Sequence, residues 1–170
     1  MRFPDCQTVV FCDTAAKCQS AAATLGACPV LVLDCEGHNL GAAGGTLSVL
    51  RSVTADARTY LTDVPHLAPI ALQPVADLLR APAIRKVAFD GRMHSSALYH
   101  HPLHAELRNV LDLQLVDVMS RFARGQTCAT QQRRLRSFLK TDELYTRPRL
   151  YTQVHRMGSL DGALRSTRSS

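Results

Sequence analysis

The 170-residue sequence contains no tryptophan, and aromatic residues make up only 5% of it. Its apolar runs are far shorter than the roughly 20 residues that a membrane-spanning helix needs. Residues Met1–Asp5 also lack the apolar stretch of a secretory signal. We therefore expect an intracellular protein, of the cytoplasm or nucleus, that does not insert into a membrane.

The sequence has no C-x-x-C pair, the spacing common in structural zinc sites and thiol redox motifs. Its six cysteines are Cys6, Cys12, Cys18, Cys28, Cys35 and Cys128. We therefore expect free thiols in a reducing compartment rather than a structural zinc site.

The overall composition is typical of one globular domain, with 46% apolar and 20% charged residues. The formal net charge is +6, and the positive charge is concentrated in the C-terminal part. Ten arginines occur there: Arg121, Arg124, Arg133, Arg134, Arg136, Arg147, Arg149, Arg156, Arg165 and Arg168. A basic surface of this kind favours nucleic acid as a partner. The alternative, for residues 159–170, is a solvated basic tail.

The central feature of the sequence is a buried strand that ends in two acids. It begins with four apolar residues, Val30–Leu33, and Asp34 and Glu36 follow at alternate positions. Because side chains alternate along a strand, both carboxylates point to one side and Cys35 to the other. Oxygen ligands of this kind suit Mg²⁺ or Mn²⁺, although both acids could simply face water. Gly37 is expected to let the chain turn after them.

Three strands joined by short links predict an antiparallel meander. They are the central strand, Thr46–Val53 and Thr59–Val64. Strict alternation would place Leu47, Val49 and Arg51 on one face of the second strand. A strand and a capped helix precede the meander, at Thr8–Cys12 and Ala15–Leu25, with Asp13 or Thr14 as the N-cap.

Helices and strands alternate after the meander, which predicts parallel pairing. In order they are helix Ile70–Leu79, strand Arg85–Asp90, helix His94–His100, strand Val110–Leu113 and helix Gln114–Ala123. On the last helix, Leu115, Val118, Met119 and Phe122 are predicted to face inward. The expected fold class is therefore α/β: a mixed sheet, made of a three-stranded antiparallel meander followed by β-α-β-α, flanked by helices.

Three short sequence patterns occur in the order and at the spacings of one known family. D-x-E-G-x-x-L stands at Asp34–Leu40, K-V-x-x-D-x-R at Lys86–Arg92 and N-V-x-D-x-Q at Asn109–Gln114. With the predicted order of strands and helices, residues 8–124 resemble the DEDD-superfamily 3′–5′ exonuclease domain of the ribonuclease D type. The resemblance implies a ribonuclease H-like fold.

The resemblance also implies an activity: hydrolysis of phosphodiester bonds at nucleic-acid 3′ ends by two ions, Mg²⁺ or Mn²⁺, held by four carboxylates. Asp34 and Glu36 match the first pattern and are the expected catalytic metal ligands. Asp34 would bridge both ions, and Glu36 would lie near the attacking water. By the same resemblance, His38, Asn39 and Arg92 are expected to contact a single-stranded 3′ end of RNA or DNA.

The match departs from the family pattern at the later acids. The position of the third acid falls on His94 or near it, and an imidazole brings no negative charge to balance two dications. Asp90 would replace it only if the strand end were displaced; otherwise Asp90 caps the following helix. Arg147–Arg149 and Tyr151 faintly echo the last pattern, and His155 stands where its acid should be.

The third pattern contains Asp112 and Gln114, to which the resemblance gives a structural role near the site. We expect residues 1–125 to form the exonuclease-like core, 126–158 its degenerate or incomplete C-terminal part, and 159–170 a disordered tail. Two functions follow. One is a 3′–5′ exonuclease built on Asp34 and Glu36, and the other is a catalytically inactive exonuclease fold kept as a nucleic-acid-binding or protein-scaffold module.

Overall fold

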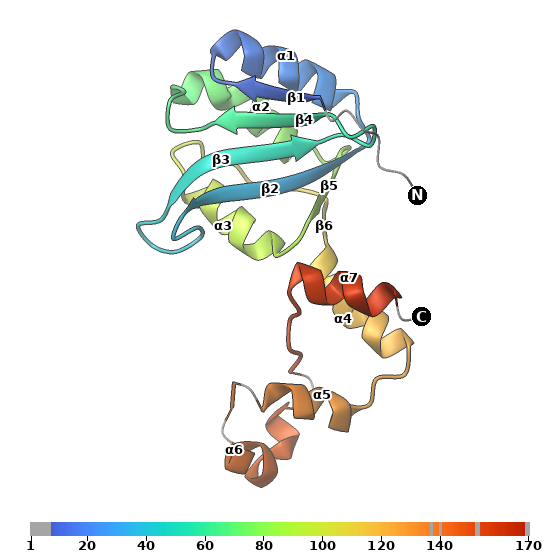
Figure 1. The fold of residues 1–170 in the computed structure, drawn as a ribbon. Helices are drawn as coiled ribbons and strands as arrows, with labels where there is room; N and C mark the ends of the chain where they lie inside the picture. Colours follow the sequence, from blue (N-terminus) through green and yellow to red (C-terminus); the bar gives the residue numbers. More distant parts are fainter. Residues whose placement is uncertain (1–7, 137, 140, 152–153, 169–170) are drawn as a thin grey trace. The chain divides into compact units, whose positions relative to one another are not determined.

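A computed structural model describes residues 8–136, 138–139, 141–151 and 154–168 of the chain (Figure 1). The chain divides into two compact units, Met1–Asp112 and Leu113–Ser170. The first unit contains the whole sheet, and the second consists of helices and their connections. Among the described residues, no helix is both long enough and apolar enough to cross a membrane.

The first unit is built on one six-stranded mixed sheet with the order β1-β4-β3-β2-β5-β6. Its strands are β1 (Val9–Cys12), β2 (Val30–His38), β3 (Thr46–Val53), β4 (Thr59–Asp63), β5 (Arg85–Ala88) and β6 (Val110–Asp112). Strands β2, β3 and β4 pair antiparallel, whereas β5 pairs parallel to β2 and β6 parallel to β5. The predicted meander followed by parallel β-α-β-α is therefore confirmed, and β1 adds a parallel edge strand beside β4.

Three helices flank this sheet: α1 (Ala15–Gly26), α2 (Pro69–Arg80) and α3 (Gly91–His100). Thr14 is the N-cap of α1, because its Oγ1 accepts a hydrogen bond from the Lys17 backbone N–H at 3.3 Å. Apolar side chains of α1 and α2, such as Leu25 and Leu72, share one core with the sheet. We call the sheet face that bears this core the covered face.

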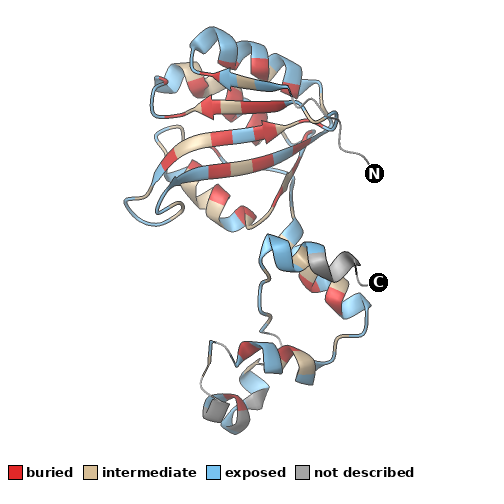
Figure 2. Cartoon of the chain, in the orientation of Figure 1, coloured by how far each residue is buried: buried red, intermediate tan, exposed pale blue. Residues whose placement is uncertain are grey.

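Burial alternates along β2 (Figure 2), because successive residues of a strand lie on opposite faces of the sheet. Leu31, Leu33 and Cys35 lie on the covered face and are 0%, 2% and 3% exposed. Val32 is 47% exposed on the opposite face, which also bears Asp34 and Glu36. We call this the open face; the antiparallel register adds Val49 and Arg51 of β3 to it. Alternation thus puts both acids on one face and Cys35 on the other, as the sequence predicts, and in the structure both acids contact solvent.

A β-bulge changes the register where β2 passes its acids. Glu36 pairs with Val49 but Gly37 pairs with Leu47, so β3 uses the extra residue Ser48. The extra residue reverses the alternation, and Leu47 joins the covered face while Val49 stays on the open face. The prediction that Leu47 shares a face with Val49 and Arg51 is therefore wrong.

The role expected for Gly37 also needs correction. The chain does not turn there, because β2 continues to His38 and the turn follows. Glycine is required for another reason: a Cβ at this position would lie 1.9 Å from the backbone oxygen of Thr46. The two strands approach each other so closely at the bulge that no side chain fits between them.

The second unit consists of short helices. They are α4 (Leu113–Ala123), α5 (Cys128–Leu135), α6 (Thr141–Thr146), the 3₁₀ helix η1 (Pro148–Tyr151) and α7 (Leu160–Arg168). Helix α7 lies in the segment for which the sequence predicts disorder. Its first turn is stabilised by Ser159, whose Oγ accepts a hydrogen bond from the Gly162 N–H at 3.2 Å.

Helix α4 does not bury the apolar stripe that its sequence predicts. Val118 is buried, but Leu115, Met119 and Phe122 are 54%, 66% and 46% exposed. The buried side of α4 instead includes Arg121, which is ion-paired and hydrogen-bonded within this unit. A polar network, rather than apolar contact, therefore decides which side of α4 is covered, and the predicted inward stripe is wrong for three of its four residues.

Candidate active site

The two acids of β2 lie on the open face of the sheet. The Asp34 side chain is 44% exposed, and Glu36 is also exposed. In the antiparallel register, Asp34 stands directly opposite Arg51 of β3. Directly opposed residues of an antiparallel pair lie on the same face of the sheet, so Arg51 places a basic side chain on the face that bears Asp34. Arg51 was not predicted as a site residue, although the pairing of the two strands was.

His94 approaches Asp34 from the first turn of α3. Its Nε2 lies 3.6 Å from Asp34 Oδ1 and 3.0 Å from the backbone oxygen of Phe89. A carbonyl oxygen can only accept a hydrogen bond, so Nε2 must carry a hydrogen and donate it. His94 is only 6% exposed, and its Nδ1 is buried without a hydrogen-bond partner among the described residues. Neither ring nitrogen therefore offers a lone pair to solvent on the open face.

The N-terminus of α3 has an unusual cap. Asp90 occupies the N-cap position in the left-handed conformation, with φ 58° and ψ 50°, and its side chain makes no capping hydrogen bond. Asp112 supplies the cap instead: its Oδ2 accepts a hydrogen bond from the Gly91 N–H at 2.9 Å. The expectation that Asp90 caps α3 thus holds for its position but not for its side chain. Asp112 fixes the end of the helix that presents His94.

Two of the residues predicted to contact a nucleic-acid 3′ end, His38 and Asn39, lie where β2 ends and the next loop begins. His38 is the last residue of β2, and Asn39 starts the turn with a positive φ of 46°; both are exposed. The loop is held against α3, because the Ser96 hydroxyl donates to the backbone oxygen of Gly41 at 2.9 Å. Arg92 is exposed in the first turn of α3, two residues before His94.

Other predicted residues belong to the second unit. The Gln114 side-chain amide donates to the backbone oxygen of Gly158 at 2.9 Å. His155 packs edge-on against Phe122, with 4.6 Å between ring centroids. Arg147 and Arg149 are exposed. Within their unit, these residues take part in contacts among the helices or face solvent.

Between the two acids, Cys35 has a strongly altered environment. Burial, and to a smaller extent the negative charges of Asp34 and Glu36, raises the pKa of its thiol to about 12. The thiol therefore stays protonated at neutral pH and behaves as a core side chain rather than as a nucleophile or a metal ligand.

Comparison with models of protein families gives no match, and comparison with curated protein sequences gives none either. Solved structures do match. Trypanosoma brucei RNase D in complex with RNA U12 is 27% identical, with a TM-score of 0.57, over 64% of this chain and 38% of that chain. The Nibbler EXO domain of Aedes aegypti is 17% identical, with a TM-score of 0.62, over 75% of this chain and 62% of that one.

A third match is the EXD2 exonuclease domain soaked in Mg, which is 20% identical with a TM-score of 0.54 and covers 95% of this chain and 82% of that chain. The chain has the fold of a DEDD 3′–5′ exonuclease domain. It spans only 38% of the length of the T. brucei RNase D chain.

The DEDD exonuclease fold allows the donor set to be tested against a pair of divalent ions. Asp34 and Glu36 stand on the strand expected for the first two acids, and His94 projects toward Asp34 with an N–H rather than a carboxylate. Among the described residues, no group of three or more His, Cys, Asp or Glu side chains could hold a metal ion. Two carboxylates and a hydrogen-bond donor do not fit a two-metal centre, which needs several negative oxygen ligands.

Proposed function

We propose that this protein is a nucleic-acid-binding domain that keeps the DEDD exonuclease fold without the two-metal hydrolytic centre. The observation that carries the proposal is the position of His94. It is buried in the first turn of α3, where its Nε2–H is directed to the Phe89 carbonyl oxygen beside Asp34. His94 stands next to Asp34 at the position where the family resemblance leads us to expect the third carboxylate, which supports the proposal.

The charge balance explains why hydrolysis should be lost. Two divalent ions bring four positive charges, and Asp34 and Glu36 supply two negative ones. His94 adds none, and Arg51 brings a further positive charge opposite Asp34. Each missing carboxylate removes both a ligand and a compensating charge, so the affinity for a pair of Mg²⁺ or Mn²⁺ ions should be low.

The same charges favour a polyanion. The chain has a net charge of +6, and T. brucei RNase D, which has the same fold, was crystallised with RNA U12. Arg51 and Arg92 are exposed, and exposed guanidinium groups bind phosphates in bidentate geometry. We infer that a single-stranded 3′ end lies along the open face, near His38 and Asn39. The Asp34 and Glu36 carboxylates would restrict how closely its phosphates approach.

A second candidate function is 3′–5′ exonuclease activity at this site. It is favoured by one observation: Asp34 and Glu36 lie at alternate positions on the open face, as the first two acids of an active site would. A solved EXD2 exonuclease domain was soaked in Mn and GMP, the kinds of ligand that such an activity would involve. Under this alternative, another ligand would have to replace the third carboxylate.

The test is digestion of a single-stranded oligonucleotide labelled at its 3′ or 5′ end, with Mg²⁺ or Mn²⁺, alongside a binding measurement by fluorescence anisotropy. The variants are Asp34→Ala, His94→Asp and, as a matched control, Asp77→Ala, which removes an exposed acid of α2. We expect the wild type to bind the strand without shortening it, and His94→Asp to gain measurable cleavage. Stepwise shortening by the wild type, lost in Asp34→Ala and kept in Asp77→Ala, would establish the second candidate instead.

A further inference from the structure

Helix α3 exposes one aromatic ring near its C-terminal end. Tyr99 is 52% exposed, and two imidazole rings contact it edge-on. Its ring centroid lies 5.4 Å from that of His100, with an interplanar angle of 84°, and 6.2 Å from that of His104, with an angle of 72°. Rings that meet nearly at right angles do not stack, so neither imidazole covers Tyr99 as a stacked partner would. Part of the Tyr99 ring therefore stays open to a planar ligand.

The surroundings of Tyr99 are fixed by the loop that follows α3. His104 has a left-handed backbone with φ 43°, a conformation that a non-glycine residue adopts only at a cost and that is common at functional sites. Its Nδ1 donates a hydrogen bond to the backbone oxygen of Tyr99 at 2.9 Å. Arg80 of α2 holds the same loop, because one terminal nitrogen donates to the backbone oxygen of Leu103 at 2.7 Å. The His104 ring is thus placed beside Tyr99 before any ligand binds.

An open cavity of about 400 Å³ lies beside Tyr99, and its other lining residues are Ser95, Ser96, Glu106 and Leu107. Leu107 packs against the core and makes part of the cavity apolar, whereas the serines and Glu106 add hydroxyl and carboxylate oxygens. The charge of Glu106 is partly balanced by Arg108, whose Nη2 lies 3.4 Å from Glu106 Oε2. An aromatic ring and an apolar side chain with a few polar groups suit a flat heterocycle with polar edges.

The cavity lies on the same side of α3 as Arg92, the residue predicted to contact a nucleic acid. Arg92, Ser95, Ser96 and Tyr99 have the i, i+3, i+4, i+7 spacing of one helix face. Arg92 and Tyr99 are both exposed, and the seven residues between their positions span about 10 Å along the helix axis. A nucleic-acid strand with one phosphate at Arg92 can therefore bring a neighbouring base to Tyr99.

The charges around the cavity favour a nucleotide over a basic protein segment. A lysine or arginine of a protein partner would bind over the Tyr99 ring by a cation–π contact, but Arg92 and Arg108 would repel it. A nucleotide combines a flat base with a negative phosphate, so it matches both the ring and the two arginines. Aromatic side chains bind the bases of single strands by stacking on them.

We propose that Tyr99 stacks on a base of a single-stranded nucleic acid whose phosphate is bound by Arg92. The proposal rests on the function proposed above and adds a base contact to it. Tyr99 is the residue that contacts the ligand, and His104 is a positioning residue that holds the side of its ring. Every base has a flat face, so this contact adds affinity without selecting a sequence.

The first measurement is the affinity of full-length variants for a labelled single-stranded oligonucleotide, by fluorescence anisotropy over a range of salt concentrations. Tyr99→Ala should weaken binding about fivefold or more, because one base loses its stacking partner, and Tyr99→Phe should keep most of the affinity. The salt dependence should not change in Tyr99→Ala, which loses no phosphate contact. Arg92→Ala should reduce its slope by about 0.7, the equivalent of one phosphate.

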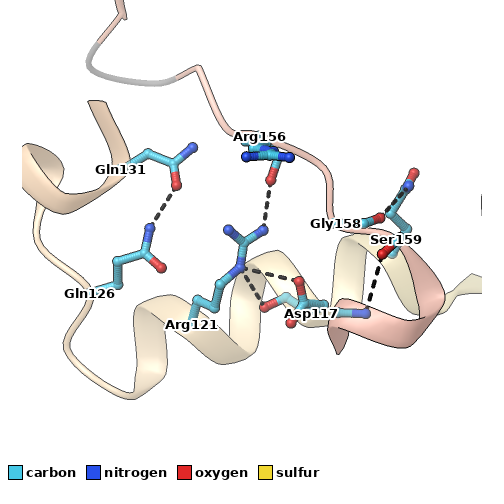
Figure 3. A network of polar contacts seen from close by, with 9 residues as sticks. Asp117, Arg121, Gln126, Gln131, Arg156, Gly158 and Ser159 are labelled. Atoms are coloured by element: carbon cyan, nitrogen blue, oxygen red, sulfur yellow. Dashed lines mark hydrogen bonds and ion pairs between the residues drawn. The ribbon is translucent and has the colours of Figure 1, made fainter. Parts of the chain in front are cut away.

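The matched control is Phe138→Ala, which removes an exposed aromatic ring of the second unit. Phe138 is 69% exposed, but the Arg156 guanidinium already lies over its ring, 5.0 Å from the centroid. The backbone of Arg156 is itself held, because Arg121 donates a hydrogen bond to its oxygen at 2.8 Å (Figure 3). This ring already has a partner, so Phe138→Ala should bind the oligonucleotide like the wild type.

The second measurement uses oligonucleotides with single abasic sites placed stepwise from the 3′ end, which keep every phosphate and lack one base each. At one position the abasic site should weaken binding by the wild type and have little further effect in Tyr99→Ala. If the wild type binds and Tyr99→Ala loses no more affinity than Phe138→Ala, the stacking proposal is overturned and the proposed function stands. Equal sensitivity of the wild type and Tyr99→Ala to every abasic site would also overturn it. If the wild type binds no oligonucleotide, the proposed function fails, and the stacking proposal fails with it.

Discussion

The two faces of β2 have different roles: one packs into the core and stabilises the fold, and the other carries the exposed side chains of the candidate site. On the covered face, Leu33 and Cys35 are 2% and 3% exposed and belong to the core. On the open face, Val32 is 47% exposed and Asp34 is 44% exposed in its side chain. A substitution on the covered face removes packed atoms, whereas one on the open face mainly changes what the surface binds. The open face can therefore lose or exchange catalytic groups while the fold persists.

The largest loss of stability is expected at Gly37, where the backbones of β2 and β3 approach each other most closely and both faces of the sheet depend on their pairing. Gly37→Ala would place a Cβ 1.9 Å from the backbone oxygen of Thr46, which cannot move without breaking the pairing of β2 and β3. We expect a loss of about 3 kcal/mol or more in the free energy of unfolding, measured by urea denaturation. Gly44→Ala is the control, since its Cβ meets nothing within 4 Å and only its positive φ of 76° opposes the change, at a cost of roughly 1 kcal/mol. Equal losses would contradict the account of the bulge.

The second prediction compares the loss in the free energy of unfolding for substitutions of two neighbouring residues of β2 that lie on opposite faces. Leu33→Ala removes a buried side chain from the core and should cost about 2–4 kcal/mol in the free energy of unfolding. Val32→Ala, one residue earlier on the open face, should cost less than about 1 kcal/mol. Urea denaturation of both variants under one condition gives the comparison. A large loss in Val32→Ala would mean that the open face is covered in solution.

A smaller effect depends on pH. The Cys35 thiol has a pKa of about 12 in the folded protein, above its ordinary value of 9.0. Between these values only the unfolded chain releases the proton, so stability is full below pH 9 and falls as pH rises toward 12. At about pH 10 the loss should be roughly 1 kcal/mol relative to pH 8.

The measurement is urea denaturation of wild type, Cys35→Ala and Cys128→Ala in reducing buffer at both pH values. Cys35→Ala should lose part of the wild-type decrease, and Cys128→Ala, which removes an exposed thiol, should keep it. An identical decrease in all three proteins would show that the Cys35 thiol does not stay protonated in the core as proposed.

Most of the fold follows from periodicity in the sequence. The run Val30–Leu33 and the alternation after it predict a central strand with its acids on one face, and the short links predict the meander. The bulge at Ser48 could not be predicted in this way, because one extra residue hardly changes the local composition, yet it reverses the faces of the β3 residues before it, Leu47 among them. The stripe of α4 was wrong for a related reason: periodicity identifies an apolar side but not what covers it.

The candidate site was predicted unevenly. Alternation places Asp34 and Glu36 together from the sequence, but the approach of His94 to Asp34 depends on how α3 meets the sheet, which only the family resemblance suggested. The sequence could not show that Asp112 caps α3 in place of Asp90, because this cap is a hydrogen bond between Gly91 and Asp112, which are 21 positions apart in the chain. Arg51 could have been found from the predicted pairing, had the register of β2 and β3 been assigned residue by residue.

The central claim is that the site lacks a two-metal centre because His94 stands in place of a carboxylate. It is tested most directly by isothermal titration of Mn²⁺ into wild type, Asp34→Ala, His94→Ala and His94→Asp. We predict weak binding by wild type and His94→Ala, and an affinity about tenfold higher or more in His94→Asp, since a carboxylate there adds a charged ligand. Tight binding of two ions per chain by the wild type, lost in both Asp34→Ala and His94→Ala, would contradict the account and make His94 a metal ligand.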